Sequence, residues 1–250
     1  TDQGLQNLQT MSIKIYGDTV YIGTRAGIYI SADWGQTWSL LNSYYSNSTI
    51  YCMEFFKDYI LAGIKGNTIL MSSDKGINWT TSIIPFNNYD LDIVDIKFMG
   101  DKPAAPGLPL PFIYLGTSHS GGLNDPVSYR GRGVFISSNS GISWIEANWG
   151  LLYNLGVSSI EESSGTKFIS MNTLGGVYYA TGIAGYYNMW KPYNKGLTNS
   201  NIYKLLATDK YLFAGTQGGM YRLELSDVGI LDVNDYAIER KNYFYSYPPY

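Results

Sequence analysis

Hydrophobic positions alternate with polar ones in short runs along the chain, and turn residues separate these runs every few positions. Pairs of apolar runs linked through glycine lie at 20–30, 60–71 and 113–136, with weaker versions at 168–179 and 212–221. Alternation with a period of two is typical of half-buried β-strands, and a turn between two such strands makes a hairpin. No helical periodicity of three and four residues extends over a useful length. The pattern therefore predicts an all-β protein.

A further alternating run precedes the hairpin in each unit, as at 12–16, 93–98 and 202–206, and a short run follows it. Each unit therefore has four strands, and five units follow one another. A series of four-stranded units of about 40 to 50 residues is typical of a β-propeller, in which neighbouring blades cover each other's faces. We expect a propeller over residues 1–228, with blades at about 4–43, 44–88, 89–151, 152–197 and 198–228.

An eight-residue motif, Ser-x-Asx-x-Gly-x-x-Trp, follows the hairpin in the first three units and begins at Ser31, Ser72 and Ser137. The Asx side chain can accept backbone N–H groups of a turn, glycine supplies a left-handed conformation, and tryptophan can anchor the following strand by packing. We interpret the motif as a structural turn and not as a binding site. Its key residues are Asp33, Gly35, Trp38, Asp74, Gly76, Trp79, Asn139, Gly141 and Trp144.

This motif resembles the Asp-box, or BNR repeat, of the sialidase, sortilin and xyloglucanase-like propellers. The resemblance covers nearly the whole chain, from about Gly4 to Asp227. It implies a β-propeller in which each box forms the turn between the third and fourth strands of a blade. It implies little about function, because the same turn occurs in propellers with unrelated activities.

The last two units and the chain start depart from the repeat. The fourth unit keeps Trp190 without the box, and the fifth has no tryptophan after Ser226 and no evident fourth strand. Residues 1–5 resemble the links at 148–151 and 194–197, which follow a fourth strand. Two arrangements stay open at this point: a piece of a longer chain with blades upstream, and a five-bladed ring closed by the tail.

Residues 229–250 contain two prolines and many tyrosines, which favours an extended linker over a helix. The stretch resembles the linker before the sorting domain of proteins exported by type IX secretion, although an aromatic segment packing back on the propeller would have the same composition. Together with the low charged fraction of 15% and the single cysteine, Cys52, this favours an extracellular or cell-surface location.

Composition excludes several partners. Lys and Arg number 17 against 20 Asp and Glu, so no basic excess is available for nucleic acid. No apolar stretch approaches about 18 residues, so we expect no membrane span. One cysteine and one histidine make a metal site improbable, and we expect no cofactor.

No catalytic set is evident in the chain. A sialidase needs an arginine triad, a tyrosine nucleophile and acidic partners, whereas this chain has five arginines and no Arg-Ile-Pro motif before the first box. Xyloglucanases place paired carboxylates in a cleft, and Asp90, Asp92 and Asp95 form a carboxylate cluster. We interpret that cluster as a solvated loop and strand edge.

The largest departure from the repeat is an insertion in the third unit, at 101–111, followed by the loop 118–132. Loops that outgrow a regular scaffold often carry recognition. Calcium binding through Asn124 and Asp125 is disfavoured because EF-hand spacing is absent, and a lone histidine in such a loop is more often a surface hydrogen-bonding group than a catalyst. The candidate ligand-binding residues are His119, Tyr129, Arg130 and Arg132.

These observations favour a secreted or cell-surface propeller that acts as a non-catalytic binding or structural module with a protein or glycan partner. The alternative is part of a polysaccharide-active glycoside hydrolase whose catalytic complement lies outside this chain. Self-assembly through open blade edges, or pairing with upstream blades of one precursor, is the third class, because exposed strands invite pairing with another chain.

Overall fold

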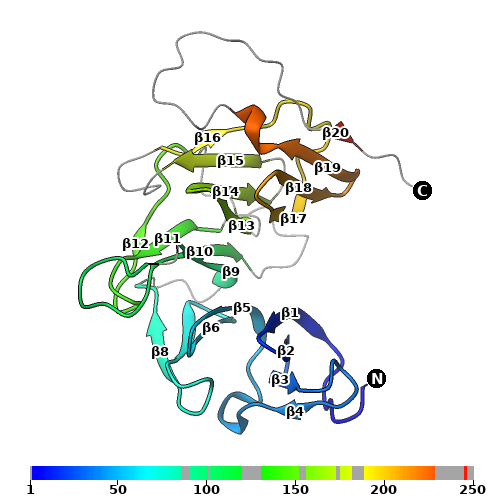
Figure 1. The fold of residues 1–250 in the computed structure, drawn as a ribbon, viewed down its shortest axis with the longest axis vertical. Coiled ribbons are helices and arrows are strands. Elements are labelled where there is room, and N and C mark those ends of the chain that lie inside the picture. Colours follow the sequence, from blue (N-terminus) through cyan, green and yellow to red (C-terminus); the bar gives the residue numbers. More distant parts are fainter. Residues whose placement is uncertain are drawn as a thin grey trace. The chain divides into compact units, whose positions relative to one another are not determined.

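The structure is a computed structural model that describes residues 2–85, 91–100, 102–119, 131–151, 156–172, 175–181, 189–228 and 245–246. In these residues, 20 strands form five four-stranded sheets, and the strands of every sheet follow chain order (Figure 1). The only helical elements described are two short 3-10 helices, η1 (Ser43–Tyr45) and η2 (Leu225–Val228). The predicted all-β propeller of four-stranded blades is confirmed.

The chain divides into two compact units, residues 1–115 with 136–145, and residues 116–135 with 146–250. The first unit holds two complete sheets. The first sheet contains β1 (Thr10–Tyr16), β2 (Thr19–Thr24), β3 (Gly27–Ser31) and β4 (Ser39–Leu40). The second sheet contains β5 (Ile50–Phe56), β6 (Tyr59–Ile64), β7 (Thr68–Ser72) and β8 (Thr80–Ile83). Neighbouring strands in both sheets are antiparallel.

The boundary between the units runs through the third sheet. This sheet contains β9 (Leu91–Met99), β10 (Phe112–His119), β11 (Gly133–Ser137) and β12 (Ile145–Glu146). The insertion after β9 is partly packed, because the Ala104 N–H donates to the Leu110 carbonyl over 2.9 Å and Leu110 is fully buried.

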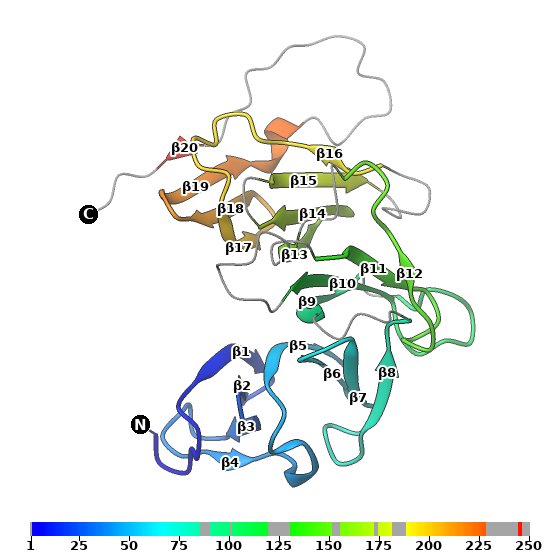
Figure 2. The same cartoon turned by 180° about the vertical axis from the view of Figure 1, so that it is seen from behind.

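The second unit holds the last two sheets, which are seen from behind in Figure 2. The fourth sheet contains β13 (Val157–Ser163), β14 (Thr166–Met171), β15 (Gly176–Thr181) and β16 (Lys191–Pro192). The fifth sheet contains β17 (Ile202–Ala207), β18 (Tyr211–Thr216), β19 (Gly219–Glu224) and β20 (Tyr245–Ser246).

The fifth sheet corrects one sequence-based expectation. The sequence pattern indicates no fourth strand there, but the tail supplies β20, with Ser246 opposite Tyr221 and Tyr245 opposite Arg222. A two-residue strand leaves no alternating pattern, because its pairing uses only backbone N–H and C=O groups. The rest of residues 229–250 lies outside the described residues.

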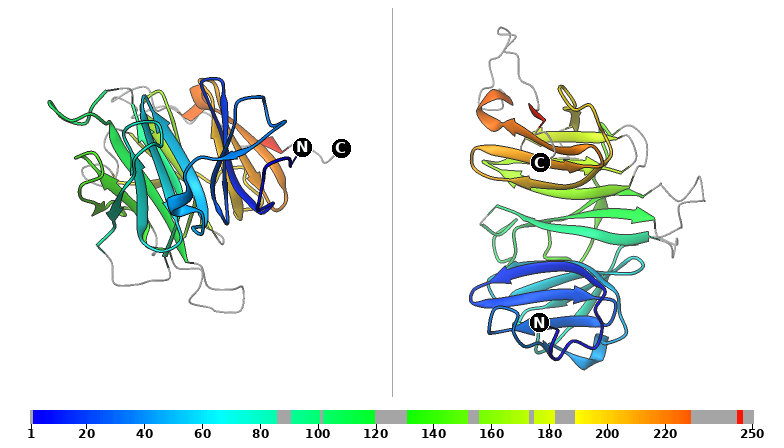
Figure 3. Two further views of the ribbon diagram at one scale, coloured as in Figure 1. Left: turned by 90° about the horizontal axis from the view of Figure 1, so that it is seen from below. Right: turned by 90° about the vertical axis from the view of Figure 1, so that its right-hand side faces the viewer.

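Each unit has a core made where one sheet packs on the next. In the first unit, Ile28 of the first sheet packs against Met53 and Leu70 of the second. In the second unit, Phe168 of the fourth sheet packs against Leu205 of the fifth. Figure 3 shows the first and second sheets, in blue and cyan, side by side. Within each unit, alternation along the strands therefore directs one set of side chains toward the neighbouring blade.

Candidate functional site

The three Ser-x-Asx-x-Gly-x-x-Trp motifs form hydrogen-bonded turns between the third and fourth strands of their blades. In the first, the Ser31 hydroxyl donates to the Asp33 carboxylate over 2.7 Å and accepts the Gly35 N–H over 2.7 Å. The carboxylate also accepts the Thr37 N–H over 2.8 Å and the Thr37 hydroxyl over 2.6 Å. Trp34 and Gly35 both have positive φ, 57° and 88°. A glycine at the second position relieves the strain of that conformation.

The other two motifs repeat this geometry. Ser72 donates to Asp74 over 2.8 Å, and Ser137 donates to Asn139 over 2.9 Å. The Asn78 N–H donates to Asp74 over 2.8 Å, and the Ser143 N–H donates to Asn139 over 2.9 Å. Aspartate and asparagine therefore both supply the side-chain oxygen that accepts the backbone N–H. The hydrogen bonds of these side chains stay within their own turns.

Hydrogen bonding to Asp33 makes the first turn sensitive to acid. The Thr37 hydroxyl and N–H, with help from Ser31, lower the pKa of Asp33 from 3.8 to about 2. A carboxyl whose pKa is lower in the folded state stabilises the fold above its ordinary pKa and loses that contribution as pH falls toward the folded value. We expect Asp33→Asn, which copies the third motif, to flatten the dependence of the melting temperature on pH between about 4 and about 2. Parallel curves for wild type and variant would contradict this.

The motif tryptophans differ in burial. Trp144 is buried, and its indole N–H donates over 2.8 Å to the hydroxyl of Ser82 in the preceding blade. Trp190 of the fourth blade, which lacks the motif, is also buried and donates over 2.7 Å to the Ala147 carbonyl. Trp79 is half-buried and donates over 2.9 Å to Gly76 of its own turn. Trp79 therefore leaves part of its ring accessible.

That accessible part of Trp79 lines a pocket of about 440 Å³ in the first unit. Tyr45 of η1 meets the indole edge to face, with ring centroids 6.3 Å apart. Because the Trp79 N–H is bonded to Gly76 and Tyr45 packs against its ring, the indole is held in one orientation. The pocket is lined by Asn42, Ser43, Tyr45, Ile77, Asn78, Trp79, Thr80 and Thr81. We call this the Trp79 pocket.

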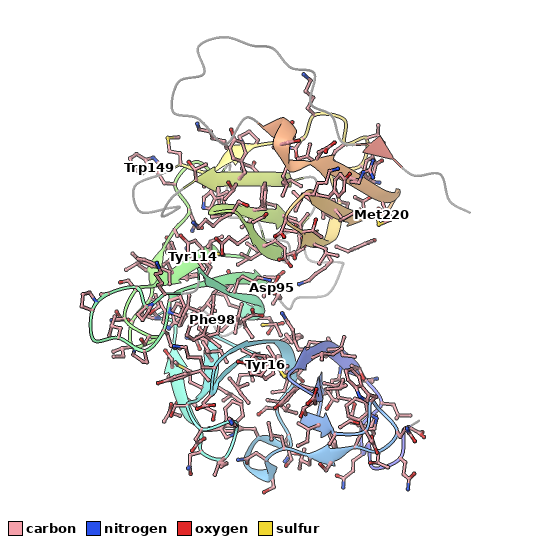
Figure 4. The ribbon with its side chains drawn as sticks, in the orientation of Figure 1. Tyr16, Asp95, Phe98, Tyr114, Trp149 and Met220 are labelled. Carbon is pink, nitrogen blue, oxygen red and sulfur yellow. The ribbon has the colours of Figure 1, made fainter. Side chains whose placement is uncertain are left out.

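A second pocket of about 360 Å³ lies at the β1–β2 and β5–β6 turns. Tyr16, labelled in Figure 4, stacks on Phe55 at 5.2 Å between ring centroids. The Lys75 Nζ lies 3.4 Å from the Asp58 carboxylate in the lining of this pocket. Tyr21 also lines the pocket, and burial raises the pKa of its hydroxyl. This pocket combines aromatic rings with charges of both signs, so its lining favours no single ligand class.

The predicted carboxylate cluster is not solvated, and that expectation is wrong for two of its members. Asp92 and Asp95, both on β9, are only 5% and 6% exposed, and Asp90 lies outside the described residues. Asp92 accepts the Gly66 N–H over 3.3 Å. Burial, followed by the charge and hydrogen bond of Asp92, raises the pKa of Tyr51 to about 12. Residues on both faces of β9 are buried, so the strand has no solvated side. Figure 4 labels Asp95 on this strand.

The predicted ligand-binding loop is mostly beyond the described residues. His119 ends β10, but its side chain, Tyr129 and Arg130 fall outside them. Arg132 is described: its N–H donates to the Thr117 hydroxyl over 2.9 Å, and its carbonyl accepts from the Asn148 amide over 2.8 Å. These bonds fix the backbone where the loop returns to β11.

Two further properties hold for the described residues. No group of three or more His, Cys, Asp or Glu side chains among them is placed to hold a metal ion. Within the same residues, no helix has the length and apolar character needed to cross a bilayer.

Comparison with known proteins identifies the fold and not the family. No known family and no curated protein matches the chain. An ancestral GH74 enzyme matches with a TM-score of 0.66 at 15% identity, covering 98% of this chain and 33% of that one. YCF48 bound to a D1 peptide matches with a TM-score of 0.59 at 15% identity, covering 90% and 66%. U3-55K matches with a TM-score of 0.62 at 13% identity, covering 90% and 63%.

These matches agree with the propeller fold, and each of the three proteins is longer than the region that this chain covers. The chain spans about a third of the GH74 enzyme and about two thirds of the YCF48 chain. At such low identity the likeness extends to the fold alone.

The sequence does not predict the Trp79 pocket, because its motif indicates only a structural turn at Trp79. The available signal was the Asn-Ser-Tyr-Tyr segment at 42–45, which follows the fourth strand of the first blade. The pocket forms where that segment meets the motif of the next blade, a contact that only the packing of the two blades creates.

Proposed function

We propose that the chain is a non-catalytic binding module built on an Asp-box propeller and displayed outside the cell, and that the Trp79 pocket holds a sugar unit of a glycan partner. The observation that carries this proposal is the pocket lining. A fixed indole and a tyrosine lie beside the side chains of Asn42, Asn78 and Thr81. Aromatic rings pack against the C–H face of a sugar, while amides and hydroxyls bond to its hydroxyl groups.

The same lining favours binding over chemistry. The eight residues around the Trp79 pocket include no carboxylate, histidine or lysine. General acid–base catalysis of glycoside cleavage needs carboxyl groups on both sides of the scissile bond. A sugar in this pocket would therefore be held and not cleaved.

Filling the pocket tests the proposal. Thr81→Tyr places a bulky side chain at an exposed strand position that lines the pocket, and Ile83→Tyr makes the same change two residues further along the same face of β8, outside the lining. We expect neutral β-glucan and xyloglucan oligosaccharides to bind the wild type and Ile83→Tyr in calorimetry. Thr81→Tyr should weaken that binding at least tenfold, about 1.4 kcal/mol. Equal affinities in both variants would remove the pocket from consideration.

A second candidate function is part of a polysaccharide hydrolase completed by residues outside this chain. Two observations favour it: the likeness to a GH74 enzyme over 98% of this chain, and the buried carboxylates Asp92 and Asp95. Release of reducing ends from the same oligosaccharides would reveal hydrolysis. Turnover that is lost in Asp95→Asn, with an unchanged melting temperature, would overturn the non-catalytic proposal.

A further inference from the structure

The three motifs differ at the residue before their tryptophan. This residue is Thr37 in the first motif, Asn78 in the second and a serine in the third. The Thr37 hydroxyl donates to the Asp33 carboxylate over 2.6 Å, and the Asn78 side-chain amide donates to the Asp74 carboxylate over 2.7 Å. A hydroxyl is therefore enough for this bond of the turn, and the second motif carries a larger polar group than the turn requires.

The Asn78 amide has one orientation. Hydrogen bonds from the Asn78 N–H and from its amide lower the pKa of Asp74, which keeps that carboxyl ionised at neutral pH. An ionised carboxylate only accepts hydrogen bonds, so the NH₂ group of Asn78 has to face it. The carbonyl oxygen Oδ1 of Asn78 is then left over, and no described residue donates to it. Asn78 lines the Trp79 pocket and is exposed, so the pocket contains a fixed hydrogen-bond acceptor.

Ile77, the residue before Asn78, adds an apolar group to the same lining. Its side chain is 74% exposed. The corresponding residue of the first motif is Gln36, which shows that the turn does not require an apolar side chain at this position. The pocket therefore has an apolar side chain and a carbonyl acceptor on two consecutive residues.

The other lining residues do not distinguish one neutral sugar from another. Trp79 and Tyr45 offer aromatic rings, which pack against the C–H face that many pyranoses share. The Thr81 hydroxyl can either donate or accept a hydrogen bond. Ile77 and Asn78 are then the residues that decide which substituents of the sugar fit best.

We infer that the Trp79 pocket prefers sugars with a 2-acetamido group, such as the N-acetylglucosamine units of chitin-type glycans. This inference rests on the proposed function, because it names the sugar class for the same pocket. The acetamido N–H donates to the Asn78 carbonyl, and the acetamido methyl group packs on Ile77. A hydroxyl group in place of the acetamido group uses the acceptor but leaves Ile77 without an apolar partner.

The charge of the lining agrees with a neutral amide. The eight residues described around the pocket include no charged side chain. The carboxylate of a uronic acid would therefore find no cation there. The ammonium group of a deacetylated amino sugar would lose water beside Ile77 without gaining an anionic partner in the lining.

Three trisaccharides with the same β-1,4 linkage test the preference by calorimetry: cellotriose, tri-N-acetylchitotriose and its fully deacetylated form. Burial of one methyl group is worth about fourfold in affinity, and a neutral hydrogen bond adds a similar factor. We expect the wild type to bind the acetylated trimer about tenfold more tightly than cellotriose. The deacetylated trimer should bind no more tightly than cellotriose.

The repeated motifs supply the variants. Asn78→Thr copies Thr37, so it keeps a hydroxyl for Asp74 and removes the carbonyl acceptor. Ile77→Gln copies Gln36 and removes the apolar partner of the methyl group. Each variant should reduce the tenfold preference to about threefold, and the double variant should have no preference. The melting temperature of each variant shows whether its turn is intact.

The control is Ile142→Gln, which makes the same change at the same position of the third motif. Ile142 is 80% exposed and does not line the pocket, so this variant should bind both trimers as the wild type does.

The outcomes separate this inference from the proposed function. If the wild type binds cellotriose and the acetylated trimer equally, and Thr81→Tyr weakens both, the acetamido preference is overturned and the sugar pocket stands. A preference that persists in the double variant, or an equal gain from the deacetylated trimer, also overturns the inference. If neither trimer binds the wild type, or if Thr81→Tyr changes neither affinity, the proposed function fails and the preference fails with it.

Discussion

Trp144→Ala is expected to lower the free energy of unfolding by about 3 to 5 kcal/mol, the usual cost of removing a buried tryptophan. The indole is only 4% exposed and packs at the junction of the second and third blades. Its N–H bonds to the Ser82 hydroxyl, which in turn donates to the Gly141 carbonyl, so truncation also unpairs a buried hydroxyl acceptor. Chemical denaturation followed by tyrosine and tryptophan fluorescence measures the loss.

Two companion variants separate packing from hydrogen bonding at this junction. Trp144→Phe keeps much of the apolar contact and loses the N–H donor, so it should cost less than the alanine variant. Trp79→Ala removes a half-buried ring that bonds only to its own turn, and it should also cost less. Equal losses for Trp79→Ala and Trp144→Ala would contradict the difference in burial on which this prediction rests.

The strand content was predictable because its signals are local. Period-two alternation and the three motifs beginning at Ser31, Ser72 and Ser137 each fall within a few neighbouring residues. The hydrogen bonds of those motifs also stay within one turn, so an eight-residue window contains the whole arrangement. A short window of sequence is therefore enough to predict these elements.

The remaining features depend on how blades pack, and packing is not local. The sequence suggests that Asp92 and Asp95 belong to a solvated loop and strand edge, yet both side chains are buried on β9. The Trp79 pocket joins residues 42–45 to residues 77–81 across two blades. Strand β20 is two residues long and pairs with a strand more than twenty positions earlier. The pattern of hydrophobic and polar residues along the chain does not predict any of these contacts.

The glycines at the blade junctions are visible in the sequence, but the residues that require them there are not. Gly23, Gly63 and Gly116 interrupt strongly apolar strands, a position where glycine weakens a strand unless something approaches closely. The approaching groups, Ile50, Ile93 and Val157, come from the following blade. Only the structure identifies them.

Gly63→Ala is therefore expected to cost about 3 kcal/mol of unfolding free energy, at the upper end of ordinary overpacking. The added Cβ would lie 2.6 Å from the Cys52 sulfur and 2.7 Å from both the Cγ2 methyl and the carbonyl oxygen of Ile93. The carbonyl is backbone, so relief requires the second and third blades to separate. Gly215→Ala is the matched control at the corresponding register position: its Cβ would meet only the Lys204 carbonyl oxygen, at an ordinary contact distance of 3.7 Å, and we expect its effect to stay within about 0.5 kcal/mol. Denaturant titration of both variants measures the difference, and equal stabilities would show that the glycine contact does not determine the spacing between blades.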